Sequence, residues 1–363
     1  MSFNRTCHSL TRRKFTTLST LGFLNLMATS AGAAITLPNL VKSPRSLKLG
    51  TTFSQLQCWY LGLDYRQAFR EICDLGFQRL RLCAYWHELQ PRANQFDFTT
   101  IDWLLEESDR RGIEVTLAVG MKAPRYPEFH FPDWMRSKHD TKTARVLDRD
   151  PAIADLTLTM LDRVVSHLRT APVIKYWQVE NEPFTTLEIT HGRSLSESFV
   201  RKEVKLVRSR SRPDQKILLT NAITLPDGQG QEDSQAFRAS LWLADALGFN
   251  VYTKVPQGET QSYIEAQPLY WKKLEDWRAE LKRWGKERWI AEAQAEPWEA
   301  NELVPVLQNE YPSSSPIQAA RIVDRVQKIG FDPVLLWGCE YWYWHRRQGR
   351  DRWWIGMQQL LDS

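Results

Sequence analysis

The sequence predicts a single (β/α)8 barrel, an α/β fold in which eight parallel strands alternate with helices. Three observations predict it: eight short apolar segments after residue 47, helical patterns between them, and a repeated glycine. Gly76, Gly112, Gly248 and Gly330 each stand between a helical pattern and an apolar residue. A glycine there can adopt the left-handed conformation that ends a helix. About 320 residues also fits the usual size of such a barrel.

The apolar segments are short, and several are rich in Val, Ile and Leu without alternation, which is typical of parallel strands covered by helices. The predicted strands are Leu49–Ser54, Phe77–Cys83, Ile113–Val119, Val173–Val179, Ile217–Asn221, Phe249–Tyr252, Trp289–Glu292 and Val334–Trp337. Helix starts are indicated at Asp150–Pro151, Ser194–Glu197 and Ser315–Pro316. A doubly wound open sheet is the alternative, but it usually has a glycine-rich turn after its first strand. Gly50 is followed by Thr-Thr-Phe-Ser instead.

The first 33 residues have the pattern of an export signal. A twin-arginine motif, Thr11–Phe15, precedes an apolar stretch to Ala28, and Ala31–Ala33 has the small-x-small pattern of a cleavage site. We expect a Tat-type signal peptide over 1–33, an N-terminal extension over 34–46 and the barrel over 47–363. A Sec signal with an incidental arginine pair is the alternative. Either signal predicts an exported bacterial protein, periplasmic or extracellular. A Tat signal makes the Tat export machinery its partner in transit.

The apolar stretch is too short to span a bilayer comfortably, and no cysteine follows it, so no stable membrane anchor is expected. The chain has 48 basic and 43 acidic residues, but four basic residues and no acidic one lie within positions 1–33. The remainder is almost neutral. Because neutralisation of phosphates supplies much of the affinity for nucleic acid, we expect no nucleic-acid partner.

The four cysteines after the signal are Cys58, Cys73, Cys83 and Cys339, and none is in a CxxC pair. Buried free thiols are the favoured interpretation, with one disulfide left open in an oxidising compartment. The seven histidines show no metal-ligand spacing. We therefore predict neither a metal site nor a cofactor.

Two carboxylates stand where predicted strands end. Glu182 follows the fourth strand and Glu292 ends the seventh, and these strands lie across the barrel mouth from each other. Reactive groups of such barrels lie at this end of the strands. The second strand alternates Arg79 and Arg81 with leucines, so period two directs both arginines into the barrel. A cation near the rim favours the ionised form of a neighbouring carboxyl group.

Two carboxyl groups in different environments are what cleavage of a glycosidic bond requires. One must stay protonated to supply a proton to the leaving oxygen, and the other must be ionised below the sugar ring. The chain also contains 16 tryptophans, whose faces suit the apolar C–H faces of sugars.

The motifs resemble a known clan. Asn181–Pro183 after the fourth strand, Glu292, and Arg81 within Gly76–Leu82 resemble the retaining (β/α)8 glycoside hydrolases, which include family 5 cellulases and mannanases and family 42 β-galactosidases. The resemblance covers residues 49–340. Three further segments share it: Tyr85–Pro91, Phe96–Phe98 and Ile101–Asp102.

This resemblance implies a retaining β-glycosidase that hydrolyses O-glycosidic bonds of β-linked oligosaccharides, polysaccharides or glycosides, with Arg81 in its site. Glu182 would be the general acid/base and Glu292 the nucleophile. Asn181 would bind the sugar 2-hydroxyl, Tyr252 would hold the nucleophile, and Trp337 would form the floor of the subsite.

Alternatives remain both for the identity of the two glutamates and for the activity. Glu180 is the rival of Glu182, and Glu296 and Glu340 are the rivals of Glu292. A transglycosylase would use the same site with another acceptor. A catalytically dead, carbohydrate-binding barrel is the other alternative, and the presence of both glutamates argues against it.

Overall fold

The computed structural model describes residues 49–363 except 187, 259–261, 300–303 and 305. The predicted signal peptide (1–33) and extension (34–46) lie outside the described residues. The barrel strands are β1 (Leu49–Thr52), β2 (Arg79–Cys83), β3 (Glu114–Val119), β4 (Ile174–Val179), β5 (Lys216–Ala222), β6 (Ala246–Val251), β9 (Glu287–Gln294) and β10 (Val334–Trp337). They close into a barrel in this order, and each neighbouring pair is parallel. The predicted (β/α)8 barrel is confirmed.

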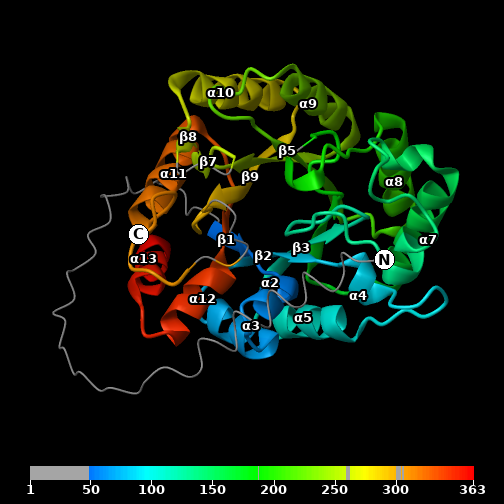
Figure 1. The fold of residues 1–363 in the computed structure, drawn as a ribbon, viewed down its shortest axis with the longest axis horizontal. Helices are drawn as coiled ribbons and strands as arrows, with labels where there is room; N and C mark the ends of the chain where they lie inside the picture. Colours follow the sequence, from blue (N-terminus) through cyan, green and yellow to red (C-terminus); the bar gives the residue numbers. More distant parts are fainter. Residues whose placement is uncertain (1–48, 187, 259–261, 300–303, 305) are drawn as a thin grey trace. The chain divides into compact units, whose positions relative to one another are not determined.

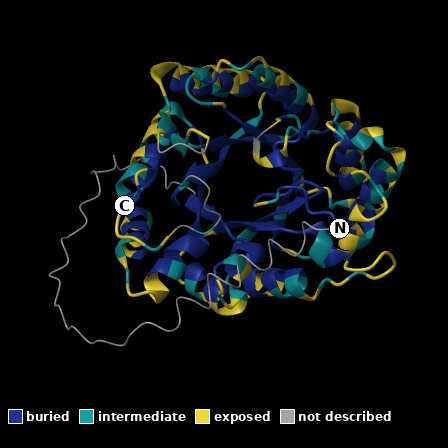
Figure 2. Cartoon of the chain, viewed as in Figure 1, coloured by how far each residue is buried: buried dark blue, intermediate teal, exposed yellow. Residues whose placement is uncertain are grey.

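Helices surround the barrel, with their inner faces buried and their outer faces exposed (Figures 1 and 2). The α-helices are α2 (Gln55–Tyr60), α3 (Tyr65–Cys73), α4 (Trp86–Leu89), α5 (Thr99–Arg110), α6 (Asp133–Arg136), α7 (Pro151–Leu168), α8 (Glu197–Arg210), α9 (Gln231–Leu243), α10 (Pro268–Arg283), α11 (Pro316–Ile329), α12 (Cys339–Arg347) and α13 (Arg352–Leu361). Two 3₁₀ turns are η1 (Leu147–Arg149) and η2 (Glu188–Thr190). A hairpin that the sequence did not predict, β7 (Lys254–Pro256) and β8 (Tyr263–Glu265), follows β6.

Local signals at the helix ends are confirmed in most places. Asp150 and Ser315 cap α7 and α11 with their side chains, each before a proline. The box expected at Ser194–Glu197 is wrong by two residues, because Ser196 caps α8. Gly248 is also a correction, since it lies inside β6 and not at a helix end. The other three glycines of the repeat have positive φ angles, as expected.

None of the described helices is long and apolar enough to cross a membrane. The four cysteines of the described chain are buried free thiols, as the sequence favoured.

One end of the barrel interior is filled by side chains from the first halves of the strands. The guanidinium of Arg79 stacks over the Trp289 ring at 4.8 Å from its centroid. Next to it lies a buried apolar cluster formed by Tyr176, Leu218, Ala246, Trp289 and Leu335. This layer fills the interior at one end of the barrel and leaves the carboxyl ends of the strands for the polar network described below.

An irregularity in β9 sets the direction of Glu292. Trp289 belongs to the interior cluster, and Glu292, three residues later, contacts Arg81 inside the barrel. Strict alternation would put residues three apart on opposite faces. The register of β9 against β6 shifts by one residue between Phe249 and Asn250, which restores the inward direction.

Two small residues make room for this bulge. A Cβ added to Gly248 would lie 2.7 Å from the Cβ of Ala291, far inside ordinary contact distance. Glycine within a strand commonly marks such a close backbone approach. Gly248, which the sequence suggested as a helix stop, is therefore a glycine because the packing of β6 against β9 leaves no room for a side chain.

A buried pair of carboxyl groups holds the turn after β4. Glu180 accepts hydrogen bonds from the backbone N–H groups of Met121 (2.8 Å) and Lys122 (2.6 Å), which ties the end of β3 to this turn. Its carboxyl group lies so close to Gly120 that an added Cβ would be 2.3 Å from an oxygen. On the other side it interacts electrostatically with the carboxyl group of Glu203 on α8, whose two oxygens have no hydrogen-bond donor among the described residues.

The pair retains a proton. Both side chains are fully buried, and burial raises the pKa of each carboxyl group. Two interacting carboxyl groups buried away from water are not both ionised near neutral pH, so the native state holds a proton that the unfolded chain releases above about pH 5.

We predict that Glu203→Gln makes the protein less sensitive to alkaline pH. The native pair binds more protons than the unfolded chain, so the unfolding free energy of the wild type falls as pH rises. A glutamine can donate to Glu180 without a proton. Relative to the wild type, the variant should gain about 1 to 3 kcal/mol between pH 5.5 and 8.5 in denaturant unfolding.

The matched control is Glu106→Gln, at an exposed position of α5. It should leave the pH dependence unchanged. A stability difference between Glu203→Gln and the wild type that stays constant with pH would contradict the shared proton.

Candidate active site

Polar side chains from six barrel strands and the residues after them gather at the carboxyl end of the barrel. This inner layer is formed by Thr52, Arg81, Gln178, Asn181, Glu182, Thr220, Asn250, Tyr252 and Glu292. Hydrogen bonds link them across strands, and nearly all are buried. The structure thus brings Arg81, Asn181, Glu182, Tyr252 and Glu292 of the predicted site into one network.

Glu292 is held by two donors. The Arg81 Nη2 atom donates to its Oε1 at 2.6 Å, and the Tyr252 hydroxyl donates to its Oε2 at 2.5 Å. The guanidinium is itself fixed by Thr52 (2.9 Å) and Gln178 (3.3 Å). The ion pair with Arg81 and the tyrosine hydroxyl together fix the direction of the Glu292 carboxylate.

Glu182 lies in a different environment. Its Oε1 accepts a hydrogen bond from the Asn250 amide at 2.7 Å, and no cation pairs with its carboxyl group among the described residues. Burial raises the pKa of Glu182 to about 7. The positive charge of Lys122 opposes this shift, and the negative charge of Glu292 adds to it. Near neutral pH, the site therefore holds a protonated carboxyl group beside an oriented carboxylate.

The backbone around Glu182 is fixed by neighbours on both sides. Its N–H donates to Thr220 Oγ1 at 3.0 Å, and its carbonyl oxygen accepts from the Lys122 ammonium at 2.8 Å. The residue has a φ of 44°, a value that non-glycine residues rarely adopt. These contacts hold the strained turn that turns the carboxyl group toward Asn250.

Asn181 is also held within the network. Its Oδ1 accepts from Gln178 (3.2 Å) and Thr220 (3.1 Å), which fixes the orientation of the amide. Its Nδ2 donates to Glu128 at 3.0 Å.

Trp337 ends β10 beside a charged cluster. Its ring lies 4.0 Å from the guanidinium carbon of Arg125, and its indole N–H has no hydrogen-bond partner among the described residues. Arg125 forms ion pairs with Glu296 and Glu340.

The three rival glutamates have other partners. Glu296 and Glu340 share Arg125, and Glu180 is bound to backbone N–H groups and Glu203. Among the described residues, none of the three is hydrogen-bonded or ion-paired to Arg81 or Tyr252, which both bind Glu292.

Sequence reasoning missed several residues of this site, among them Lys122, Glu128 and Asn250. Asn250 carried a visible signal, because it is a polar residue inside a predicted apolar strand, two positions before Tyr252. Lys122 follows the predicted third strand, but a lysine at such a position does not by itself indicate a sugar-binding site. Glu128 had no signal, since it lies in a loop whose path the sequence does not reveal.

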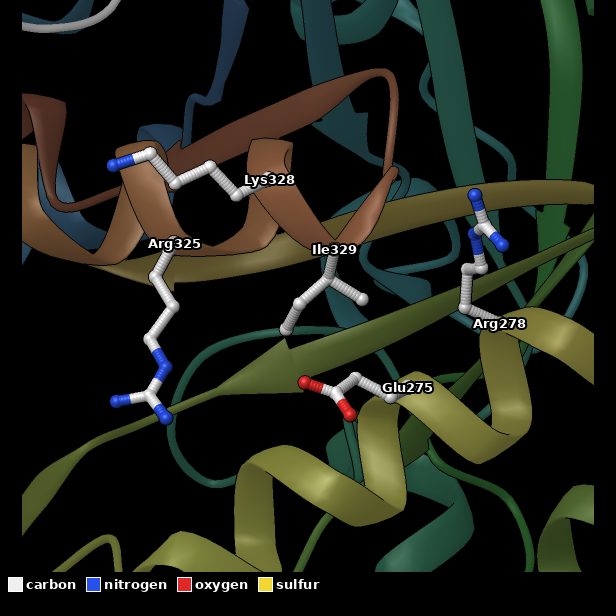
Figure 3. Close-up of a pocket in the computed structure, with 5 residues that line it drawn as sticks. All are labelled: Glu275, Arg278, Arg325, Lys328 and Ile329. Carbon is white, nitrogen blue, oxygen red and sulfur yellow. The ribbon is translucent and has the colours of Figure 1, made fainter.

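A cavity of about 500 Å³ lies elsewhere, on the outer helices. It is lined by Glu275 and Arg278 of α10 and by Arg325, Lys328 and Ile329 of α11 (Figure 3). None of these residues belongs to the network above. Among the described residues, no group of three or more His, Cys, Asp or Glu side chains is arranged to hold a metal ion.

Comparisons with known proteins give one family match. The sequence model of glycoside hydrolase family 42, described as β-galactosidase, matches residues 64–214, a stretch that includes Arg81, Asn181 and Glu182. No curated protein sequence matches the chain.

Solved structures share the fold at low identity. Xylanase 10B from Thermotoga maritima superposes with a TM-score of 0.56 and 14% identity, over 87% of this chain and 95% of the xylanase. A β-galactosidase from Halorubrum lacusprofundi gives 0.61 and 14%, over 87% of this chain but 58% of that enzyme. An exo-β-1,4-mannosidase from Opitutaceae bacterium strain TAV5 gives 0.56 and 15%, over 90% and 61%.

At these identities the likeness establishes the barrel, and the family match adds the glycoside hydrolase sequence pattern within it. Together they show a (β/α)8 barrel that matches the glycoside hydrolase family 42 sequence model over residues 64–214, in agreement with the clan that its sequence resembles.

Proposed function

We propose that the protein is a retaining β-glycosidase in which Glu182 is the general acid/base and Glu292 the nucleophile. One observation carries the proposal: two buried carboxyl groups share the barrel mouth in opposite environments. Arg81 and Tyr252 donate to one, while burial keeps the other protonated near neutral pH. Such a division between two carboxyl groups is what a double displacement needs.

In the first step, the Glu292 carboxylate attacks the anomeric carbon and the bond from that carbon to the leaving oxygen breaks. The proton of Glu182 passes to the leaving oxygen. In the second step, Glu182 takes a proton from water, whose oxygen attacks the anomeric carbon and releases Glu292 as a carboxylate. Both steps pass through a transition state with positive charge on the sugar ring.

The other residues of the network have supporting roles in this proposal. Arg81 and Tyr252 orient the nucleophile, and Asn181 binds the 2-hydroxyl group of the sugar. Trp337 forms the floor of the subsite, and its unpaired indole N–H is a donor for a sugar oxygen.

The substrate class is a β-linked saccharide or glycoside. The xylanase, β-galactosidase and mannosidase with similar barrels suggest the first probes, which are 4-nitrophenyl β-xyloside, β-galactoside and β-mannoside. Hydrolysis of none of a wider panel of aryl β-glycosides would contradict the proposal. Transfer of the sugar to an added alcohol in place of water would identify a transglycosylase. We also propose that the protein acts after export, on the pattern of residues 1–33.

Replacing either carboxyl group should abolish most of the activity. We predict that Glu182→Gln and Glu292→Gln each lower kcat by about 10³-fold or more on a phenyl glycoside, because each removes a group that acts in the transition state. The control is Glu106→Gln on the exposed face of α5, which should keep full activity. Near-normal activity in either site variant would reject its assigned role.

The two roles can be separated by the leaving group. A 2,4-dinitrophenolate leaves without a proton, so Glu182→Ala should still form the glycosyl-enzyme from that substrate, with a rapid release of dinitrophenol followed by slow turnover. Azide should accelerate turnover and give a β-glycosyl azide. Glu292→Ala should release no such burst. The opposite pattern would exchange the two assignments.

The pH dependence should report Glu182. Its pKa is raised to about 7 by burial, and only the protonated form can donate, so kcat/KM should fall as pH rises through about 7. The loss should be marked with a phenyl leaving group and weak with 2,4-dinitrophenolate, which needs no acid. An alkaline decline of equal size for both substrates would assign the titration to another group.

A further inference from the structure

Glu128 places a third carboxyl group in the site. Its Oε2 accepts the hydrogen bond from Asn181 Nδ2 at 3.0 Å, and the residue is only 8% exposed. The charges of both Glu182 and Glu292 act on its carboxyl group. The proposed double displacement uses Glu182 and Glu292 and gives Glu128 no role.

The loop after β3 is built to present this side chain. Ala123 N–H donates to the Glu128 carbonyl oxygen (2.9 Å), and Glu128 N–H donates to the Arg125 carbonyl oxygen (2.7 Å), so the loop folds back on itself. A bridge between Lys122 and Phe129 closes the turn. Glu128 has a φ of 68°, a left-handed value that a glutamate rarely adopts. Strained non-glycine residues of this kind concentrate at binding sites.

The orientation of the Asn181 side-chain amide determines which of its atoms faces Glu128. Because Gln178 and Thr220 both donate to its Oδ1, the amide nitrogen is the atom that faces Glu128. One N–H of that nitrogen is bound by the carboxyl group, and the other has no partner among the described residues. A sugar substituent that accepts from the second N–H therefore lies beside the Glu128 carboxyl group.

We infer that Glu128 is a specificity-determining residue, which together with Asn181 binds a hydroxyl group at C2 of the sugar. The inference rests on the proposed function. Asn181 donates to the oxygen of this hydroxyl group, and the hydroxyl hydrogen is donated to Glu128. A sugar with no donor at C2 leaves both side chains unsatisfied in a buried site, which weakens binding of the transition state.

The positive charge of Lys122 supports this arrangement. Burial raises the pKa of Glu128 to about 8, while Lys122 opposes the shift and Glu182 adds to it. Either protonation state keeps an oxygen that can accept from a hydroxyl group.

The test compares each aryl β-glycoside that the wild type cleaves with its 2-deoxy counterpart. The 2-deoxy sugar is intrinsically more reactive, but this difference is common to all variants and cancels in the comparison. The measured quantity is the ratio of kcat/KM for the 2-hydroxy substrate to that for the 2-deoxy substrate. We expect Glu128→Ala to lower this ratio by about 10-fold or more.

Glu128→Gln keeps an oxygen that accepts and should retain part of the ratio. Asn181→Ala should lower the ratio in the same direction, and Glu106→Gln should leave it unchanged. An equal loss of kcat/KM on both substrates in Glu128→Ala would mean a purely structural role and would overturn the inference.

The proposed function and this inference fail differently. A wild type that cleaves no glycoside contradicts the function, and the inference with it. An active wild type whose ratio is unchanged in Glu128→Ala contradicts the inference alone.

Discussion

A guanidinium enclosed by protein is the constraint on which the rest of the site depends. Arg81 has no solvent contact, and removing the partner of such a buried charge costs several kcal/mol, about 3 to 5 in measured cases. Glu292 is that partner, at 2.6 Å. The requirement that this ion pair form inside the barrel fixes the direction of both side chains, so the same contact that neutralises the arginine also aims the carboxylate at the barrel mouth.

Glu182 has no cation paired with its carboxyl group among the described residues. This carboxyl group has only the Asn250 amide as its hydrogen-bond partner in the described part of the chain, and burial raises its pKa against the opposing charges of Lys122 and Arg81. The two carboxyl groups therefore have unequal surroundings, which is the difference that the proposed acid and nucleophile require. In the buried pair of Glu180 and Glu203, burial raises the pKa of both carboxyl groups, and the positive charge of Lys122 only partly opposes the shift at Glu180.

Much of this arrangement was accessible from the sequence, for physical reasons that differ by residue. The barrel followed from apolar segments and glycine stops, and the inward direction of Arg81 followed from the two-residue period of a strand. Gly248 was misassigned because a glycine that ends a helix and one that makes room in a strand look alike in sequence. The place of Glu128 in the site could not be predicted, because it depends on a loop that reverses direction at a residue with a left-handed backbone conformation. The bulge in β9 was not predicted either, because it arises from register between strands.

That bulge carries a consequence for how the chain tolerates variation. The inward direction of the Glu292 side chain depends on the bulge in β9. That bulge fits only because Gly248 of β6 and Ala291 of β9, which nearly touch, are both small. A methyl group added at Gly248 would collide with Ala291, the residue before Glu292, and would disturb the direction of that carboxylate. Substitutions at these two small residues should therefore be poorly tolerated, and a mutational survey limited to polar positions would overlook them.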